Sequence, residues 1–331
     1  MRVVRRRQVG ALLVLAALVG VFILLRLLVY RELGGELTWS WVEADRMRLR
    51  WTSVGVAAIV GASLAVSGVL LQALLRNPLA SPFVLGISSG AALGVMVAIY
   101  LAYRFGGEQY QSGSHVVPAL VGAIATSGLV FVLAQRRGWL DPLALVLVGV
   151  VISAICGALI MFVQHLVPQG LRGDLPTWMM GHINQGAGGG LLVMTGVLAV
   201  AGVVVGVGMG GAMDAATLGD DEARSIGLAV GGLRVVLFLL AGCLTSSAVA
   251  LTGPIAFVGL IAPHAARLLV GPRHTVVVMG AALVGIALLI GSDVCSQIVS
   301  VEGGRMPVGI FTALIGGTAF IWLLRSGRGQ V

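Results

Sequence analysis

Few side chains in this sequence could carry covalent chemistry, and the most suggestive of them is a serine. Ser88 lies at the centre of GISSG, residues 86–90, which fits the G-x-S-x-G pattern of serine hydrolases. With His264 or His182 as a base, it would be the nucleophile of an intramembrane hydrolase. Ser88, however, follows a proline-broken entry to an apolar segment, where helix capping explains a serine, and no acid nearby could orient a histidine. The hydrolase stays only as an alternative.

Other residue types exclude whole classes of chemistry. All 21 basic residues are arginine. A Walker A phosphate loop and a Schiff base both need a lysine, so any ATP must bind to another chain. The five histidines and three cysteines show no spacing typical of a metal site. We therefore expect a protein that is not an enzyme, without a cofactor or metal site of its own.

One polar segment interrupts an otherwise apolar chain. Four of the thirteen acidic residues fall between residues 214 and 224: Asp214, Asp220, Asp221 and Glu222. Because acidic residues favour the first turn of a helix and glycines such as Gly219 and Gly227 end turns, LGDDEARSIGL predicts a short helix. A folded polar loop on such a chain points to a partner protein. A solvated connector without function is the alternative.

Composition places the chain in a lipid membrane. It is 58% hydrophobic and 10% charged, with a mean hydropathy of +1.03. A transmembrane helix needs roughly 20 apolar residues. About ten such stretches are predicted, at residues 9–29, 52–75, 83–103, 116–135, 142–165, 189–209, 233–252, 254–271, 275–296 and 307–324. We expect an all-α polytopic membrane protein with a single domain, residues 1–331, whose first apolar run is an uncleaved helix.

The arginines predict the orientation of these spans. With a cytoplasmic N-terminus and ten spans, both termini are cytoplasmic, and thirteen arginines fall inside against eight outside. No soluble basic face remains to bind nucleic acid. Asp293 is the only carboxylate well inside an apolar segment, and its place near the segment's end predicts a cap or a loop hydrogen bond. An ion-coupled carrier, which would keep ionisable groups deep in its spans, is the weaker alternative.

Two proline-broken segments lie within the apolar pattern. Pro78 and Pro82 forbid a continuous helix through residues 76–92, and residues 252–271 repeat the arrangement. The two segments share a faint P-[LI]-A…F-V pattern, which a transporter built from inverted repeats would show; chance similarity is the alternative. Breaks in the membrane are expected at Asn77, Pro78, Pro82, Gly253, Pro254, Pro263 and His264.

Four blocks together resemble one family of membrane proteins. RNPLASPFVLGISSGAALG, LGDDEARSIGL, GPIAFVGLIAPHAARLLVG and PVGIFTALIGG stand in the order and spacing of FecCD-type permeases, the membrane subunits of ABC importers for iron-siderophores, haem and cobalamin. The resemblance runs from about residue 50 to residue 324. It implies a ten-helix permease with type II ABC importer architecture in the bacterial cytoplasmic (inner) membrane. Its pathway would lie at a dimer axis, lined by the fifth and tenth spans.

The resemblance also implies partners and functional residues. Two ABC ATPase subunits, which hold ATP and Mg²⁺, would bind inside, a second permease subunit would complete a homo- or heterodimer, and a substrate-binding protein would dock outside. The ATPase-coupling segment, about residues 212–230, corresponds to Leu218, Gly219, Asp220, Asp221, Glu222, Ala223, Arg224, Ser225 and Gly227. Docking of the binding protein is assigned to Arg46, Arg48, Arg50 and Arg305, for which snorkelling to lipid headgroups is the alternative.

The chain also departs from the family pattern. Thr52 and Ser53 replace the proline and second arginine of an R-L-P-R entry, Gln297 replaces an arginine, and Thr318-Ala319-Phe320 replace Pro-Phe-Phe. The last two changes lie near the span that lines the path in the family, so the cargo is not transferred by analogy. The expected function is the permease of an ATP-driven importer for a ferric siderophore or related iron chelate, with haem or cobalamin as the alternative cargo.

Overall fold

The computed structural model describes residues 2–31, 37–39, 44–105, 115–136, 139–168, 174–183, 189–301 and 304–325, and helices dominate them. The α-helices of this part are α1 (Arg2–Leu28), α2 (Ala44–Leu75), α3 (Ile87–Phe105), α4 (Val116–Leu133), α5 (Pro142–Leu166), α6 (Asp174–Met179), α7 (Gly189–Gly208), α8 (Gly210–Ala216), α9 (Asp220–Ser225), α10 (Val230–Thr252), α11 (Val258–Val270), α12 (His274–Ile298) and α13 (Val308–Arg325). A 3-10 helix, η1 (Pro82–Leu85), precedes α3.

Short antiparallel hairpins join some of these helices. Within the described residues the paired strands are β1 (Val29–Arg31) with β2 (Leu37–Trp39), β3 (Gln135–Arg136) with β4 (Trp139–Leu140), and β5 (Ser300–Val301) with β6 (Gly304–Arg305). In the first hairpin Val29 pairs with Trp39. These strands close loops and add no sheet to the core.

The length of the helices confirms the prediction of a polytopic membrane protein. In the described part, α1, α2, α3, α4, α5, α7, α10 and α12 are long and apolar enough to cross a membrane. Two shorter apolar helices, α11 and the Val308–Trp322 part of α13, occupy the two remaining predicted spans. The 13 residues of α11 rise only about 20 Å, which is shorter than a bilayer core.

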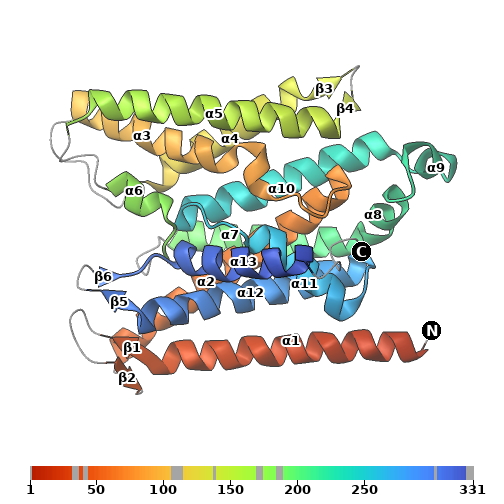
Figure 1. Cartoon of the computed structure of the whole chain (residues 1–331), viewed down its shortest axis with the longest axis horizontal. Coiled ribbons are helices and arrows are strands. Elements are labelled where there is room, and N and C mark those ends of the chain that lie inside the picture. Colours follow the sequence, from red (N-terminus) through yellow and green to blue (C-terminus); the bar gives the residue numbers. More distant parts are fainter. Residues whose placement is uncertain are drawn as a thin grey trace.

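The long helices run roughly along one direction, which gives the bundle two distinct ends (Figure 1). One end carries α8, α9, the β3–β4 hairpin, the start of α1 and the end of α13, and is called the α9 end below. The opposite end carries α6 and the other two hairpins, and is called the α6 end. The predicted coupling segment and the hairpins near the predicted docking arginines therefore lie at opposite ends.

The core forms around α2, which packs against both α10 and α12. A Cβ atom at Gly61 would lie 2.4 Å from the carbonyl oxygen of Gly285, so the backbones of α2 and α12 touch there. Small residues permit such close approach between membrane helices. On another side of α2, the Ser67 hydroxyl lies 2.7 Å from the Thr245 hydroxyl of α10. A buried polar contact and a glycine contact thus fix the central helices.

A buried ion pair corrects the prediction for Asp293. Its carboxylate accepts a hydrogen bond from Nε of Arg26, and the two residues are 4% and 1% exposed. The pair joins α12 to α1, so Asp293 neither caps a helix nor binds a loop. Arg26, one of the eight arginines predicted on the outer side, lies in the last turn of α1 and is buried in the bundle. The prediction failed because α1 and α12 are neighbours only in the folded chain.

Candidate functional site

The predicted coupling segment folds into two short helices, α8 and α9, at the α9 end. Asp220, Asp221 and Glu222 fill the first turn of α9, where the helix dipole favours negative charge. Gly219 precedes this turn with φ 130°, and Gly227 follows it with φ 86°, both in the region that favours glycine. The predicted short helix with glycines at its two ends is confirmed.

The surface of this segment combines acidic and apolar groups. Ala223 is fully buried and anchors α9 to the bundle, whereas the Asp221 side chain is 94% exposed. Leu218 and Ile226, before and after α9, are each 64% exposed. Glu222, Arg224, Ser225 and Gly227 are exposed as well. An acidic tip flanked by two apolar side chains has the mixed character of a protein-binding surface.

Asp220 connects α9 to two other parts of the bundle. Its carboxylate lies 2.5 Å from Nη2 of Arg76, which follows α2, and 2.9 Å from Nη2 of Arg234 on α10. Arg224 of α9 itself lies 3.9 Å away. Partial burial raises the pKa of Asp220, but Arg234, Arg76 and Arg224 outweigh it and hold the pKa below its ordinary value. Asp220 is therefore an ionised link between α9, α10 and the end of α2.

Asp214 makes a second link, from α8 to the start of α12. Its Oδ1 lies 2.6 Å from Nδ1 of His274 and accepts a 3.0 Å hydrogen bond from the His274 backbone N–H. This satisfies one of the amides that a helix leaves open at its N-terminus. Asp214 thus joins α8 to the start of α12.

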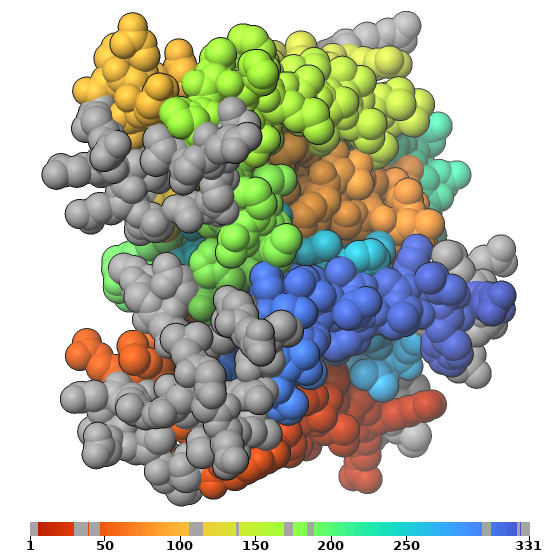
Figure 2. All heavy atoms as spheres, turned by 60° about the vertical axis from the view of Figure 1, so that its left-hand side comes forward, coloured from red at the N-terminus to blue at the C-terminus, as the bar shows by residue number. Residues whose placement is uncertain are grey.

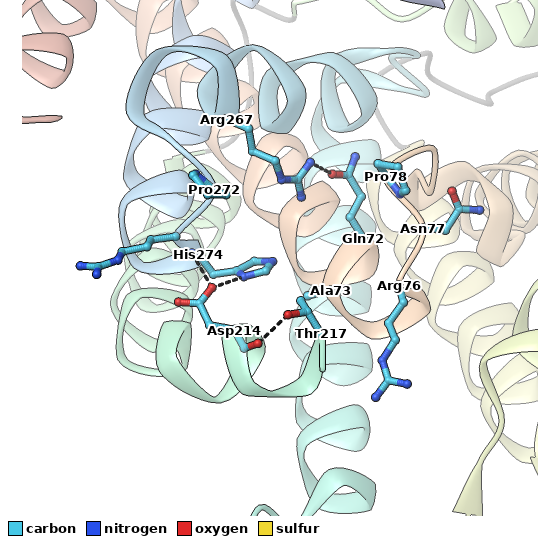
Figure 3. A pocket seen from close by; sticks show the side chains of 11 residues that line it. Gln72, Ala73, Arg76, Asn77, Pro78, Asp214, Thr217, Arg267, Pro272 and His274 are labelled. Atoms are coloured by element: carbon cyan, nitrogen blue, oxygen red, sulfur yellow. Dashed lines mark hydrogen bonds and ion pairs between the residues drawn. The ribbon is translucent and has the colours of Figure 1, made fainter. Parts of the chain in front are cut away.

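A cavity of about 860 Å³ lies among these elements. In Figure 3, Arg267 and Gln72 lie on one side of it, and Asp214 and His274 lie on another. The guanidinium of Arg267 donates to Oε1 of Gln72 at 2.6 Å, which joins α11 to α2. Its lining residues are Gln72, Ala73, Arg76, Asn77, Pro78, Asp214, Thr217, Arg267, Pro272, Arg273 and His274.

The first predicted break is present. It begins beside Arg76, which follows α2 and pairs with Asp220. The helix α2 ends at Leu75, the Asn77 side chain accepts from the Leu79 N–H at 2.9 Å, and η1 begins at Pro82. The freed carbonyl of Ala80 accepts from Nε2 of Gln72. Side chains therefore satisfy the backbone groups that the prolines release.

The second break differs from its prediction. Gly253, with φ 73°, and Pro254 separate α10 from α11 as expected. The helix α11, however, runs through Pro263 and His264, so the break predicted there is wrong. Packing of neighbouring helices lets a membrane helix keep such a proline. The two broken segments meet, because a Cβ at Gly259 would lie 2.7 Å from Cδ of Pro82.

Two of the four predicted docking arginines have described side chains, and these two differ in burial. Arg48 is exposed near the start of α2, at the α6 end of the bundle. Arg50 is 2% exposed and donates from Nη1 to the carbonyl of Leu27, which takes it out of the surface set. The side chains of Arg46 and Arg305 lie outside the described part of the structure. Of the two described arginines, Arg48 is the exposed one.

Sequence reasoning missed the partners of the acidic residues. Arg76 and Arg234 were predicted to lie on the same side as the acidic segment, but nothing singled them out as its partners. Opposite charges on one side of the membrane were the available signal. The predicted topology also places Asp214, His274, Gln72 and Arg267 near that side. Gln72 is neutral, so charge gave no signal for its hydrogen bond with Arg267.

A polytopic all-α bundle with a compact charged surface at one end has the features of a membrane transport subunit. The chain belongs to the FecCD transport family, whose model matches residues 12–326, and it is a transmembrane permease. It is 36% identical to the hemin transport system permease protein HmuU of Yersinia pestis over 86% of this chain and 84% of that protein. It is 34% identical to the Fe(3+)-citrate import system permease protein YfmD of Bacillus subtilis, over 85% and 81%.

A solved structure supports the same fold. It is the structure of a metal-chelate type ABC transporter in an inward-facing conformation. The match has a TM-score of 0.81 and 26% sequence identity, and it covers 96% of this chain and 99% of the solved one. The likeness therefore extends over nearly the whole bundle.

Proposed function

We propose that this chain forms the translocation pathway of an ATP-driven importer for a ferric siderophore or a related iron chelate. It would lie in the bacterial cytoplasmic membrane with both termini inside, beside a second permease subunit, two ABC ATPase subunits that hold ATP and Mg²⁺, and an external substrate-binding protein. The observation that carries the proposal is the folded α8–α9 surface, linked by ion pairs to helices of the bundle, in a chain of this family.

The α9 end has the connections that a coupling device needs. An ATPase that closes on α9 would move Asp220, and with it Arg76 at the end of α2 and Arg234 on α10. Movement of α8 would reach α12 through Asp214 and His274. Three central helices thus receive force from one small surface, which suits a switch between two packings of the bundle. The absence of lysine from the sequence agrees with an ATP site on another chain.

A candidate pathway face supports the proposal. Figure 2 shows α5 and α13 on one face of the molecule, with the orange segment that contains η1 between them. Many exposed side chains on these helices are apolar, among them Leu147 and Val150 on α5 and Leu314 and Ile315 on α13. Exposed polar side chains are His165 on α5 and Thr318 and Arg325 on α13. A second permease subunit on this face would enclose a path whose lining side chains bind the cargo only weakly. Because the chelate already holds its iron, the path needs no metal ligands of its own, and weak binding favours release of the cargo.

Reconstitution tests this function. The chain is purified with the ATPase and binding protein encoded beside it, placed in liposomes, and assayed for ATP-dependent uptake of ferric hydroxamates, ferric citrate, haem and cobalamin. Uptake of an iron chelate that requires all the subunits supports the proposal. Cargo movement by this chain without the ATPase contradicts it.

Haem is the second candidate cargo. The observation in its favour is the 36% identity to a permease named for hemin. The same uptake panel decides between the cargoes, since only one of them should be transported at low micromolar concentration.

A further inference from the structure

The cavity at the α9 end carries more positive than negative charge. Arg76, Arg267 and Arg273 line it together with one carboxylate, Asp214. That carboxylate is already bonded to His274, and Arg76 is already paired with Asp220. The lining therefore has a surplus of cations that its own acid does not balance.

Arg267 is the central cation of this cavity. It is partly buried on α11, and the partner that the described residues supply is the neutral amide oxygen of Gln72, 2.6 Å away. A guanidinium taken out of water without a carboxylate loses hydration free energy that an amide offsets only in part. Its planar set of N–H donors matches the oxygens of a phosphate group. An anion in the cavity would supply the missing charge.

The surroundings of Arg267 favour a lipid as the source of that anion. Leu268 and Leu269, the next residues of α11, are 47% and 50% exposed and are placed to contact acyl chains. The start of α1 is fixed to the same corner, because Nε2 of Gln8 donates to the carbonyl of Val270 at 3.0 Å. Arg6 and Arg7, two residues and one residue before Gln8, are exposed there. Basic side chains and apolar side chains thus meet at one level of the bundle.

We propose that the cavity lined by Gln72, Arg267 and Arg273 binds the phosphate headgroup of an anionic phospholipid. Basic pockets between the ends of membrane helices are suited to such headgroups. The acyl chains lie along the exposed leucines of α11, and the phosphate accepts hydrogen bonds from Arg267. Since the lipid contacts α2, α11 and the start of α12, it stabilises the arrangement beside α8 and α9. The proposal requires that the chain is inserted in a membrane. It does not depend on whether the chain transports a cargo.

Native mass spectrometry of the full-length chain in detergent tests the site. The chain is mixed with equal amounts of phosphatidylglycerol and phosphatidylcholine that have the same acyl chains. We expect preferential retention of phosphatidylglycerol, and about tenfold weaker retention in Arg267→Gln, as expected for loss of one charge-assisted contact. The matched control is Arg136→Gln, which removes an exposed arginine at the same end, in the β3–β4 hairpin. This control should bind like the unchanged protein.

A second variant and a competition arm keep the result decisive. If Arg267→Gln does not fold, Arg273→Glu changes an exposed residue of the same lining and should weaken retention severalfold. Equal retention of both lipids, or equal loss in Arg136→Gln and the cavity variants, overturns the proposal. Inorganic phosphate at millimolar concentration should leave the bound lipid in place. Displacement of the bound lipid by inorganic phosphate would assign the cavity to soluble phosphate esters and overturn the lipid assignment.

Discussion

The two ends of the bundle hold their charges in different ways. At the α9 end, the Asp220 side chain is 28% exposed and is shared among three arginines, and its neighbour Asp221 is almost fully exposed. At the α6 end, Arg26 and Asp293 form one pair whose side chains are 1% and 6% exposed. Exposed ion pairs contribute little free energy individually and exchange partners readily, whereas breaking a buried pair leaves an uncompensated charge. The first arrangement suits movement, and the second suits a fixed attachment of α1.

The largest effect is expected at the buried pair. Asp293→Ala leaves Arg26 charged and unpaired, which should lower the free energy of unfolding by about 3–5 kcal/mol. Thermal unfolding of the purified chain in detergent measures the loss. The double variant Arg26→Leu with Asp293→Leu should regain most of it, and Asp221→Ala should melt like the unchanged protein. A wild-type melting curve for Asp293→Ala would show that the buried pair contributes no more stability than the exposed ion pairs at the α9 end.

Gly219 gives the next largest effect, on transport rather than on folding. Proline holds φ near −65°, whereas Gly219 has φ 130°, and a Cβ there would lie 2.1 Å from the Glu222 carboxylate. Gly219→Pro should abolish uptake by the reconstituted complex while ATP hydrolysis and membrane insertion persist, and Glu222→Arg should do the same. Gly211→Ala is the control, since a Cβ at Gly211 has no atom within 4 Å. Normal uptake in both variants would remove the coupling role from this segment.

Two neighbouring aspartates sharpen the comparison within the α9 end. Asp220→Asn removes the charge shared by Arg76, Arg224 and Arg234, whereas Asp221→Asn removes a charge that faces solvent. Amide hydrogen exchange in α9 should rise about tenfold in the first variant, the equivalent of about 1.4 kcal/mol, and stay unchanged in the second. Equal exchange in the two variants would show that Asp220 links nothing.

The arginines of α2 test the α6 end. Arg48→Glu should weaken association with the binding protein more at low salt than at high salt, because exposed charges are screened. Arg50→Glu should instead reduce the yield of folded protein, since Arg50 is buried against the Leu27 carbonyl. Surface plasmon resonance at two salt concentrations measures the first effect, and size-exclusion chromatography the second. If Arg48→Glu weakened the affinity no more at low salt than at high salt, a role of Arg48 at lipid headgroups would be favoured.

The smallest effect concerns pH. Because the pKa of folded Asp220 lies below its ordinary value of about 4, its ion pairs stabilise the fold above that pH. This contribution is lost as the pH falls through the folded pKa. Local exchange in α9 measured between pH 3 and pH 6 should rise at the acidic end, and Asp220→Asn should remove that rise. A rise of equal size in Asp220→Asn would assign it to other carboxylates.

The features that the sequence predicted well are local ones. Ten apolar stretches and the short helix between Gly219 and Gly227 follow from residues adjacent in the chain, and the structure contains them. Pairing across the bundle could not be predicted in this way. Arg76 and Asp220 are 144 residues apart, and Arg26 and Asp293 are 267 apart. The burial of Arg50 also depends on where the end of α1 lies, which no pattern in α2 records.

The contact between Gly61 and Gly285 brings the backbones of α2 and α12 together with no side chain between them. A side chain at either position would force the two helices apart. The 25 residues of α12 span about 37 Å, from His274 at the α9 end to Ile298 near the α6 end. A push on α8 at the Asp214–His274 contact would therefore act on one end of a helix that reaches the opposite end of the bundle.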